Sequence, residues 1–244
     1  MLDVSLFLLV VAVLLLGIAK GGFGGVGAPV ALPIMALAVP AEIALGALLP
    51  LLIAMDAVSV TAHRHNADKK AVLYALPASV VGVLAGAGLI ALISSDLTGA
   101  VIGLLSIIFA AMALTGFAPK IDTWPSWTSG IFGALSGLTS TLAHAGGPPI
   151  HIYFLSRGYT HGQFVATSAL FMAGVNLIKI VPFIAVGTLD WSAMLLALKL
   201  APVALVSAYL GVILSRRMSK RVFKIAVNSL MIVVGLKLIF DAVL

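Results

Sequence analysis

Apolar residues occur in long runs along most of the chain, separated by short polar turns or by glycine and proline. A run of about 20 apolar residues is long enough to cross the hydrocarbon core of a membrane as one helix. The pattern predicts spanning helices over 41–62, 71–93, 97–115, 162–186, 191–214 and 222–243, and shorter apolar segments over 4–19, 30–39, 128–143 and 149–155. The sequence therefore predicts an all-α polytopic membrane protein.

Two of the shorter apolar segments end in similar interruptions. The first covers 20–29 and contains five glycines, and the second covers 140–149 and ends in two glycines followed by two prolines. Glycine costs a helix about 1 kcal/mol relative to alanine, and proline about 3 kcal/mol in a helix interior. Non-helical backbone inside a membrane is tolerated only where protein covers it or water reaches it. We therefore interpret the interruptions as parts of a site and not as spacers.

The two interruptions lie 120 residues apart, which indicates an internal repeat. At this spacing the aligned pairs are Gly17 and Gly137, Gly27 and Gly147, Pro29 and Pro149, and Asp56 and Asn176. Broken segments at matching places in two halves point to the binding site of a transporter built from inverted repeats. The pattern predicts an N-terminal repeat over 1–115, a linker over 116–127 and a C-terminal repeat over 128–244, within one membrane domain.

Basic residues decide the expected topology. They gather in the loops 63–70 and 216–221, which the positive-inside rule places on the cytoplasmic side. The corresponding turns of the opposite halves, 187–190 and 94–96, contain no basic residue, so we expect them on the other side. This arrangement requires two inverted repeats, each with one broken, re-entrant helical hairpin and three transmembrane helices. Both chain ends then lie outside the cytoplasm.

The re-entrant hairpins are predicted over 4–39 and 128–156, with the interruptions at their tips. The arm 4–19 is about 24 Å long as a helix, and the arm 30–39 about 15 Å. The hydrocarbon core of a membrane is about 30 Å thick. Both tips are therefore expected deep within the membrane.

Each tip is expected to present the N-terminus of a returning helix that begins near Pro29 or Pro148. A helix N-terminus carries about half a positive charge, and glycine-rich backbone forms nests of N–H donors. Two such ends facing each other predict a site for a small anion. The candidate substrate-binding residues are Lys20, Gly24, Gly25, Gly27, Ala28, His144, Gly146, Gly147 and Pro148.

Ionisable residues inside the predicted spans add candidates, because burying a charge in a membrane is costly and indicates function by default. Lys20 is the residue expected to bind the substrate's charge. Asp56, Asn176, Lys179 and Lys199 are candidates for ion coupling or for a charge pair, with Lys199 as a structural partner of Asp56.

Structural alternatives stay open for several of these residues. Lys179 is also expected to reach toward the membrane surface through its flexible stem, as lysines in spans often do, and the same holds for Lys237 near a span end. His144 and His151 flank the second tip, and each is either a substrate contact or a packed, hydrogen-bonded side chain.

Composition agrees with a membrane protein and excludes several other classes. Hydrophobic residues make up 62% of the 244 positions and charged residues only 9%, against about 25% charged residues in soluble domains. The net charge of +6 does not indicate nucleic-acid binding here, because the basic residues flank apolar spans. The chain has no cysteine, so it forms no disulfide or thiolate metal site, and we expect no metal or cofactor.

These motifs resemble the sulfite exporter TauE/SafE family of membrane proteins. The resemblance rests on Gly17, Lys20, Gly21 and Gly24, on the Gly27 to Pro29 end of the first interruption, on the run from Ala145 to Pro149 with Tyr153, on the linker at Gly116 to Pro119, and on the pair Asn176 and Lys179. It covers nearly the whole chain in both halves. The family implies export of sulfite or short organosulfonates through the inner membrane of a bacterial cell.

Other functions remain to be weighed against this one. The chain is alternatively a carrier of another small anion, or of a cation bound by Asp56, although three lysines against one intramembrane acid disfavour a cation. An intramembrane hydrolase using Ser136 and His144 is disfavoured, because the sequence has neither G-x-S-x-G nor H-E-x-x-H. The expected partners are therefore a small anion and the lipid bilayer. Proton coupling and the oligomeric state are open.

Overall fold

The computed structural model describes residues 2–25, 28–115, 127–214 and 220–243, and all of its regular structure there is helical. The first half contains α1 (Leu2–Gly22), the 3₁₀ helix η1 (Ala28–Val30), α2 (Ala31–Ala36), α3 (Ala41–His63), η2 (Arg64–Asn66), α4 (Lys69–Leu92) and α5 (Ser95–Thr115). The second half contains α6 (Thr128–Ala143), α7 (Gly147–Ser156), α8 (His161–Ala185), α9 (Trp191–Leu214) and α10 (Lys220–Val243). The predicted all-α fold is confirmed.

Six of these helices are long and apolar enough to cross a membrane among the residues that the structure describes. They are α1 over Val4–Gly22, α3, α4, α5 over Leu97–Thr115, α8 and α9. Large apolar side chains such as Leu73, Val181 and Leu198 are exposed on their outer faces, as expected of surfaces that face lipid. The chain is therefore a multi-pass membrane protein, as predicted.

One predicted boundary is wrong. The first arm was expected to end at residue 19, whereas α1 continues through Gly21 and Gly22. A Cβ atom on Gly21 would collide with the backbone carbonyl of Ala208 on α9, so glycine serves close helix packing there and does not break the helix. Packing outweighs the roughly 1 kcal/mol that glycine costs a helix.

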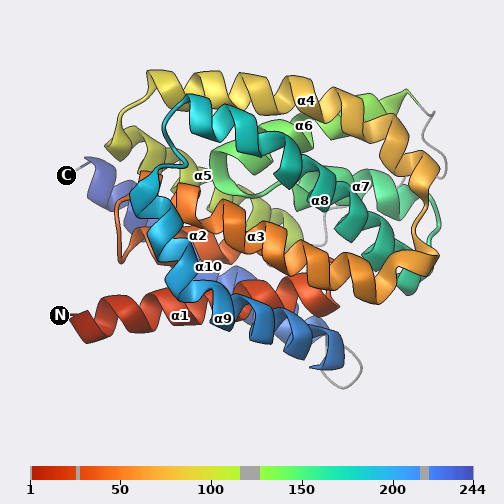
Figure 1. Ribbon diagram of the computed structural model, residues 1–244, viewed down its shortest axis with the longest axis horizontal. Helices are drawn as coiled ribbons and strands as arrows, with labels where there is room; N and C mark the ends of the chain where they lie inside the picture. The colour runs from red at the N-terminus through yellow and green to blue at the C-terminus, as the bar shows by residue number, and fades with distance from the viewer. Residues whose placement is uncertain (1, 26–27, 116–126, 215–219, 244) are drawn as a thin grey trace.

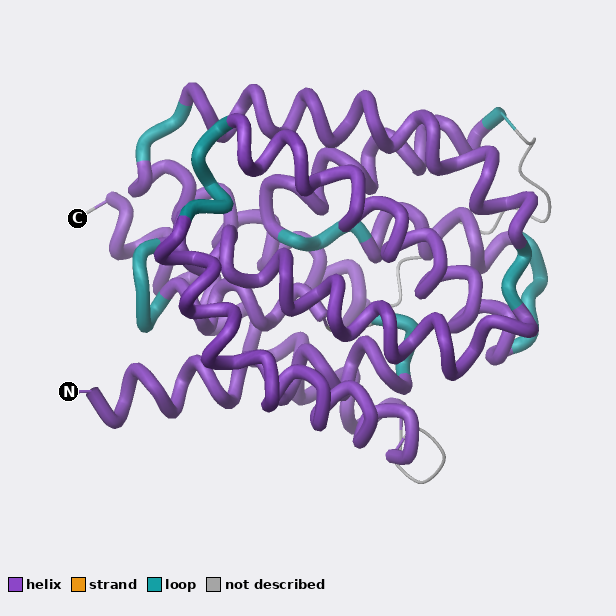
Figure 2. Tube along the Cα trace, viewed as in Figure 1, coloured by secondary structure: helices purple, strands orange, loops and turns teal. Residues whose placement is uncertain are grey.

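Both termini lie at the same end of the molecule, on the left of Figure 1. The α4–α5 and α8–α9 loops lie at this end too, whereas the α3–α4 and α7–α8 loops lie at the other end (Figure 2). Residues 64–66 and 94 are therefore at opposite ends, as the charge pattern predicts, while 216–219 lie outside the described residues. In the same view α1 and α3 run away from the termini and α6 and α8 run toward them (Figure 1).

The two halves pack against each other through their hairpin helices. Helix α1 lies along α9, and α6 lies along α4, so each hairpin helix packs on a long helix of the other half. Small residues make these contacts possible: a Cβ atom on Gly211 would lie 2.6 Å from the carbonyl oxygen of Ile18, and one on Gly86 would lie 2.7 Å from Cβ of Thr141. Close approach through small residues is the usual way in which membrane helices associate.

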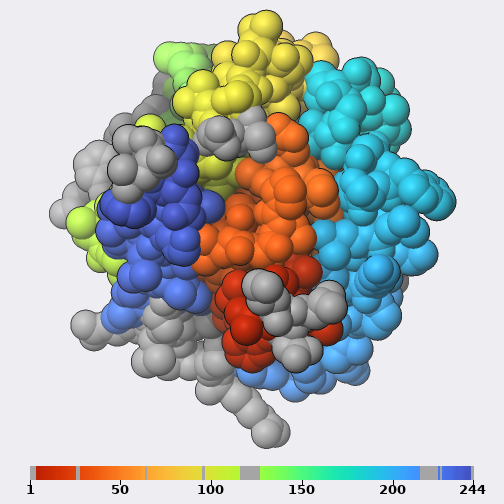
Figure 3. All heavy atoms as spheres, turned by 90° about the vertical axis from the view of Figure 1, so that its left-hand side faces the viewer, coloured from red at the N-terminus to blue at the C-terminus, as the bar shows by residue number. Residues whose placement is uncertain are grey.

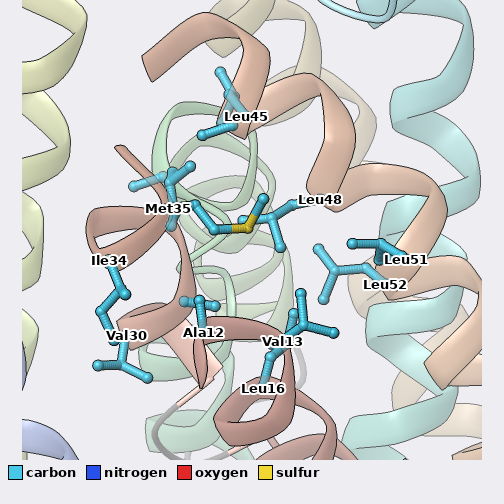
Figure 4. Close-up of a cluster of buried hydrophobic side chains, with 14 of the residues drawn as sticks. Ala12, Val13, Leu16, Val30, Ile34, Met35, Leu45, Leu48, Leu51 and Leu52 are labelled. Atoms are coloured by element: carbon cyan, nitrogen blue, oxygen red, sulfur yellow. The ribbon is translucent and has the colours of Figure 1, made fainter. Parts of the chain in front are cut away.

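Helix α3 lies at the centre of the bundle. In the end-on view of Figure 3, α2 and α3, in orange, are surrounded by the other helices. Figure 4 shows apolar side chains of α1, the returning segment and α3 packed together, among them Val13, Met35 and Leu48. This cluster anchors the first hairpin to α3.

Four long helices also contain an internal proline: Pro50 in α3, Pro77 in α4, Pro182 in α8 and Pro202 in α9.

The α3–α4 and α7–α8 loops are joined by hydrogen bonds of Asp68. Its carboxylate caps α4 by accepting from the amide of Ala71 at 3.0 Å, and it accepts from the hydroxyl of Tyr159 at 2.7 Å. Partial burial by itself raises the pKa of Asp68, but the hydrogen bonds from Tyr159 and from the helix backbone outweigh it, so the pKa lies below its ordinary value of 3.8. Asp68 is therefore held as a carboxylate at neutral pH.

This loop bridge predicts a pH-dependent loss of stability in Asp68→Ala. Removing an N-cap carboxylate costs about 1 kcal/mol of unfolding free energy. Because the pKa is lowered on folding, the stabilisation is present above about pH 4 and disappears as the pH falls through the folded-state pKa. Thermal unfolding of the detergent-solubilised protein should show the deficit at pH 7 and a smaller deficit at low pH. Asp190→Ala removes a cap of α9 whose carboxylate bonds within its own turn, so it is the control for capping alone. Asp68→Ala should lose more stability than this control, because it also loses the hydrogen bond to Tyr159, and an equal loss would contradict the bridge.

The topology predicts opposite labelling of two single-cysteine variants. The natural chain has no cysteine, so Asn66→Cys and Ser94→Cys each introduce one thiol, at exposed positions at opposite ends. A membrane-impermeant maleimide added to intact cells should label position 94 and leave position 66 unlabelled until the membrane is opened. Labelling of position 66 from outside would overturn the orientation.

Candidate functional site

The first interruption is a short turn between α1 and η1. Gly24 and Gly25 have positive φ angles of 64° and 81°, a backbone region that glycine enters at little cost. The returning segment begins at Ala28, one residue before the predicted Pro29. Gly27, which was predicted to bind substrate, lies outside the described residues.

The second interruption lies near the middle of the molecule, between α6 and α7 (Figure 2). Helix α6 ends at Ala143, and its C-cap residue His144 adopts the left-handed conformation with φ 49°. Side chains of α6 cover the freed carbonyls: Ser136 Oγ donates to Gly146 O at 2.5 Å, and Thr139 Oγ1 donates to Ala145 O at 3.0 Å. The protein itself thus satisfies this backbone, as membrane burial requires.

The returning helices offer fewer amide donors than the sequence suggests. Helix α7 begins at Gly147 and carries Pro148 and Pro149 in its first turn, and proline has no N–H group. The amides of Gly146 and Gly147 therefore supply the donors of this helix end. The returning α2 has only six residues, so its dipole is short. Anion binding at the tips depends correspondingly more on side chains.

A buried ion pair of the first half lies at the centre of the bundle and is hydrogen-bonded to the second half through Asn176. Lys20 Nζ on α1 donates to Asp56 Oδ1 on α3, and Asn176 Nδ2 on α8 donates to Asp56 Oδ2 at 2.6 Å. The three side chains are 5%, 2% and 0% exposed. Both carboxylate oxygens of Asp56 are therefore occupied by partners from other helices.

A second buried lysine, Lys179, lies on α8 about one turn after Asn176 and forms a different set of contacts. Lys179 Nζ, which is fully buried, lies 3.1 Å from Ser140 O, 3.0 Å from Ser140 Oγ and 2.8 Å from His144 Nδ1. His144 Nε2 lies 2.8 Å from the backbone oxygen of Leu45 on α3 and must donate to it. Nδ1 of a neutral His144 is then an acceptor, so all three atoms near Lys179 Nζ can accept a hydrogen bond from it.

The Lys20–Ser59 pair of the first half and the Ser140–Lys179 pair of the second half occupy matching positions, with lysine and serine exchanged. Ser59 Oγ donates to the backbone oxygen of Lys20 at 2.6 Å, and Lys179 Nζ donates to the backbone oxygen of Ser140, across the same separation of 39 residues. Asp56 and Asn176, which hydrogen-bond directly, are 120 residues apart. Sequence reasoning missed Ser59 and Ser140. The 120-residue spacing of the repeat aligns Lys20 with Ser140 and Ser59 with Lys179, so the sequence could have identified both serines as candidates.

The tips of the two hairpins approach each other beside α8. The backbone of Gly24 lies beside the His151 ring of α7, and Phe164 of α8 contacts both, with its ring centroid 4.9 Å from that of His151. His151 is 8% exposed, and its Nε2 atom is buried without a hydrogen-bond partner among the described residues. The second tip also carries His144, whose ring nitrogens contact Leu45 and Lys179 instead.

Other predicted positions are corrected by the structure. Lys199 is exposed on α9 and is not the partner of Asp56, whose carboxylate binds Lys20 and Asn176. Lys179 does not extend to the membrane surface, because it is fully buried. Lys237 is exposed and pairs with Asp241 one turn along α10. Among the described residues, no three histidine, aspartate or glutamate side chains gather as metal ligands would.

The ion pair predicts a large coupling between Lys20 and Asp56. Lys20→Met should lower the unfolding free energy by about 3–5 kcal/mol, because it leaves a buried carboxylate without its counter-charge. Lys20→Met combined with Asp56→Asn removes both charges and keeps a polar partner for Asn176, so it should recover a large part of this loss. Denaturant unfolding of the two single variants and the double variant measures the coupling, and simple additivity of the losses would contradict it.

Comparison with known proteins identifies the chain's relatives. The family model described as "Sulfite exporter TauE/SafE" matches residues 9–238, nearly the whole chain. No curated protein and no solved structure matched the chain in the same comparisons. The family indicates a membrane transporter of sulfur compounds. The chain belongs to the sulfite exporter TauE/SafE family.

Proposed function

We propose that this protein exports a small sulfur oxyanion, sulfite or a short organosulfonate, from the cytoplasm through the inner membrane of a bacterium. The observation that carries the proposal is the central polar cluster, defined as Lys20, Asp56, Asn176, Lys179, Ser140 and His144. It places two lysines and one aspartate where a membrane protein otherwise avoids charge. An excess of positive charge at that depth favours an anionic substrate.

The substrate is proposed to bind between the two hairpin tips, next to this cluster. The tips are close enough for Gly24 and His151 to be neighbours, and the second tip carries His144, which is part of the cluster. Gly146 and Gly147 offer backbone donors without a Cβ atom in the way. The cluster is buried on all sides, so transport requires a rearrangement that opens it to each side in turn.

The halves are proposed to be inverted repeats that allow this alternation. Their hairpin helices run in opposite directions (Figure 1), and each packs on the fourth helix of the other half. Alternating access in such folds is a rocking of one repeat against the other around a central site. The matching hydrogen bonds of Lys20 and Lys179 support the same relation.

Outward movement of an anion has a physical driving force. A bacterial interior is electrically negative, and the field acts on each charge with about 2.3 kcal/mol per 100 mV. An anion therefore leaves the cell without a coupled ion. A cation carrier that uses Asp56 is disfavoured, because Lys20 and Asn176 already occupy its carboxylate. Proton coupling is tested by measuring proton flux together with anion flux in liposomes that contain the purified protein.

The proposal predicts that Gly147→Leu abolishes transport. A Cβ atom at Gly147 would lie 3.0 Å from Cε1 of His151, so a leucine displaces the ring and fills the space between the tips. Flux of sulfite and methanesulfonate should be measured in liposomes containing the purified protein. Gly88→Leu is the matched control, since a Cβ atom there meets nothing within 4 Å. Normal flux through a well-folded Gly147→Leu variant would contradict a substrate site between the tips.

A further inference from the structure

The charges of the central polar cluster do not balance. Lys20 is paired with Asp56, and each carboxylate oxygen of Asp56 already accepts a hydrogen bond, one from Lys20 and one from Asn176. Lys179 forms no ion pair with a carboxylate in the part of the chain that the structure describes. Two lysines against one aspartate leave one positive charge in excess when both lysines are protonated. The excess charge belongs to Lys179.

The contacts of Lys179 match a protonated amine. An ammonium group has three N–H donors and no acceptor, and its three neighbours are two oxygens of Ser140 and the acceptor nitrogen of His144. All three are neutral groups. An anion that enters the cluster can replace one of them, because a charge-assisted hydrogen bond is about twice as strong as a neutral one.

Lys20 is less suited to receive the substrate, although it stands out most in the sequence. An anion could reach its ammonium only by displacing Asp56, and it would then lie beside a second negative charge. The substrate's charge is instead expected where no carboxylate competes for it. We propose that Lys179 receives the charge of the substrate, and that the single excess positive charge of the cluster makes the transporter select monoanions over dianions.

This inference rests on the proposed function and narrows its substrate class. A hydrogen sulfite ion or an organosulfonate carries one negative charge, whereas sulfite and sulfate carry two. One bound monoanion cancels the excess charge, and a buried cluster without net charge avoids the desolvation cost of an unpaired ion. A dianion would leave the buried site negative.

A second observation also favours a protonated ligand. Oδ1 of Asn176 is buried and has no hydrogen-bond donor among the described residues, while Nδ2 of the same amide donates to Asp56. A buried acceptor without a donor costs about 1–3 kcal/mol. Hydrogen sulfite carries a proton that it can donate, whereas the sulfite dianion carries none.

The matched positions of Asp56 and Asn176 allow the excess charge to be changed in single steps. Asn176→Asp adds a carboxylate three residues before Lys179 on α8, where side chains of one helix face meet, and brings the excess to zero. Asp56→Asn removes the existing carboxylate and brings the excess to two. The double exchange, Asp56→Asn with Asn176→Asp, restores an excess of one. It pairs Lys179 with the new carboxylate and leaves Lys20 as the lysine without a carboxylate partner, so any regained anion binding is expected at Lys20.

The experiment measures binding of methanesulfonate, a monoanion, and of sulfate, a dianion, to the purified full-length protein by titration calorimetry. The wild type should prefer methanesulfonate. Asn176→Asp should bind methanesulfonate about 100-fold more weakly, the scale expected when a buried charge loses its free partner. Asp56→Asn should shift the preference toward sulfate, and the double exchange should regain methanesulfonate binding. Lys179→Gln should lose binding, and Lys199→Gln, which removes an exposed lysine, should not.

The outcomes distinguish failure of the proposed export function from failure of the monoanion inference. If the folded wild type neither binds nor transports any sulfur oxyanion, the proposed function fails and the inference fails with it. If the wild type transports sulfite but Asn176→Asp binds methanesulfonate normally, or the wild type binds sulfate as well as methanesulfonate, only the monoanion inference is overturned. A double exchange that unfolds like the wild type yet does not regain binding would equally overturn it.

Discussion

The carboxylate of Asp56 is the group on which the arrangement of the site depends. It lies on the central helix α3 and binds one side chain from α1 and one from α8, so a single residue joins both halves. A membrane interior offers no water to a charged group, so the carboxylate is stable there only with its partners in place. Through this pairing Asp56 also determines which lysine stays without a counter-charge. In the proposed mechanism, architecture and substrate recognition are thus linked at one side chain.

Close packing of backbones supports this centre from both sides. Gly17 and Gly21 bring α1 against α9, while Gly82 and Gly137 bring α4 against α6. Any side chain at these places would push the hairpin helices outward and draw Lys20 and Ser140 away from their partners. The glycines of this protein therefore serve two purposes: some allow the turns at the tips, and others hold the two halves in register.

Much of the fold could be predicted from the sequence, because span length, loop charge and glycine-proline interruptions are local signals. The same reasoning identified Lys20, Asp56, Asn176 and Lys179 as buried functional candidates. It could not assign their partners, since pairing depends on how α1, α3 and α8 pack in three dimensions. Lys199 was a reasonable partner for Asp56 by composition, but its position on α9 leaves it exposed. The helical state of Gly21 was missed for the same reason.

The prolines inside four of the long helices have a mechanical consequence. Each proline removes one backbone hydrogen bond from its helix and displaces the carbonyl four residues earlier, so bending at that point breaks no further bond. Two of these points lie in each half, at Pro50 and Pro77 and at Pro182 and Pro202. The long helices α1, α5, α6 and α10 contain no proline. We therefore expect the long helices to bend first at these four prolines, two in each half, and the segments between them to tilt around the buried charges.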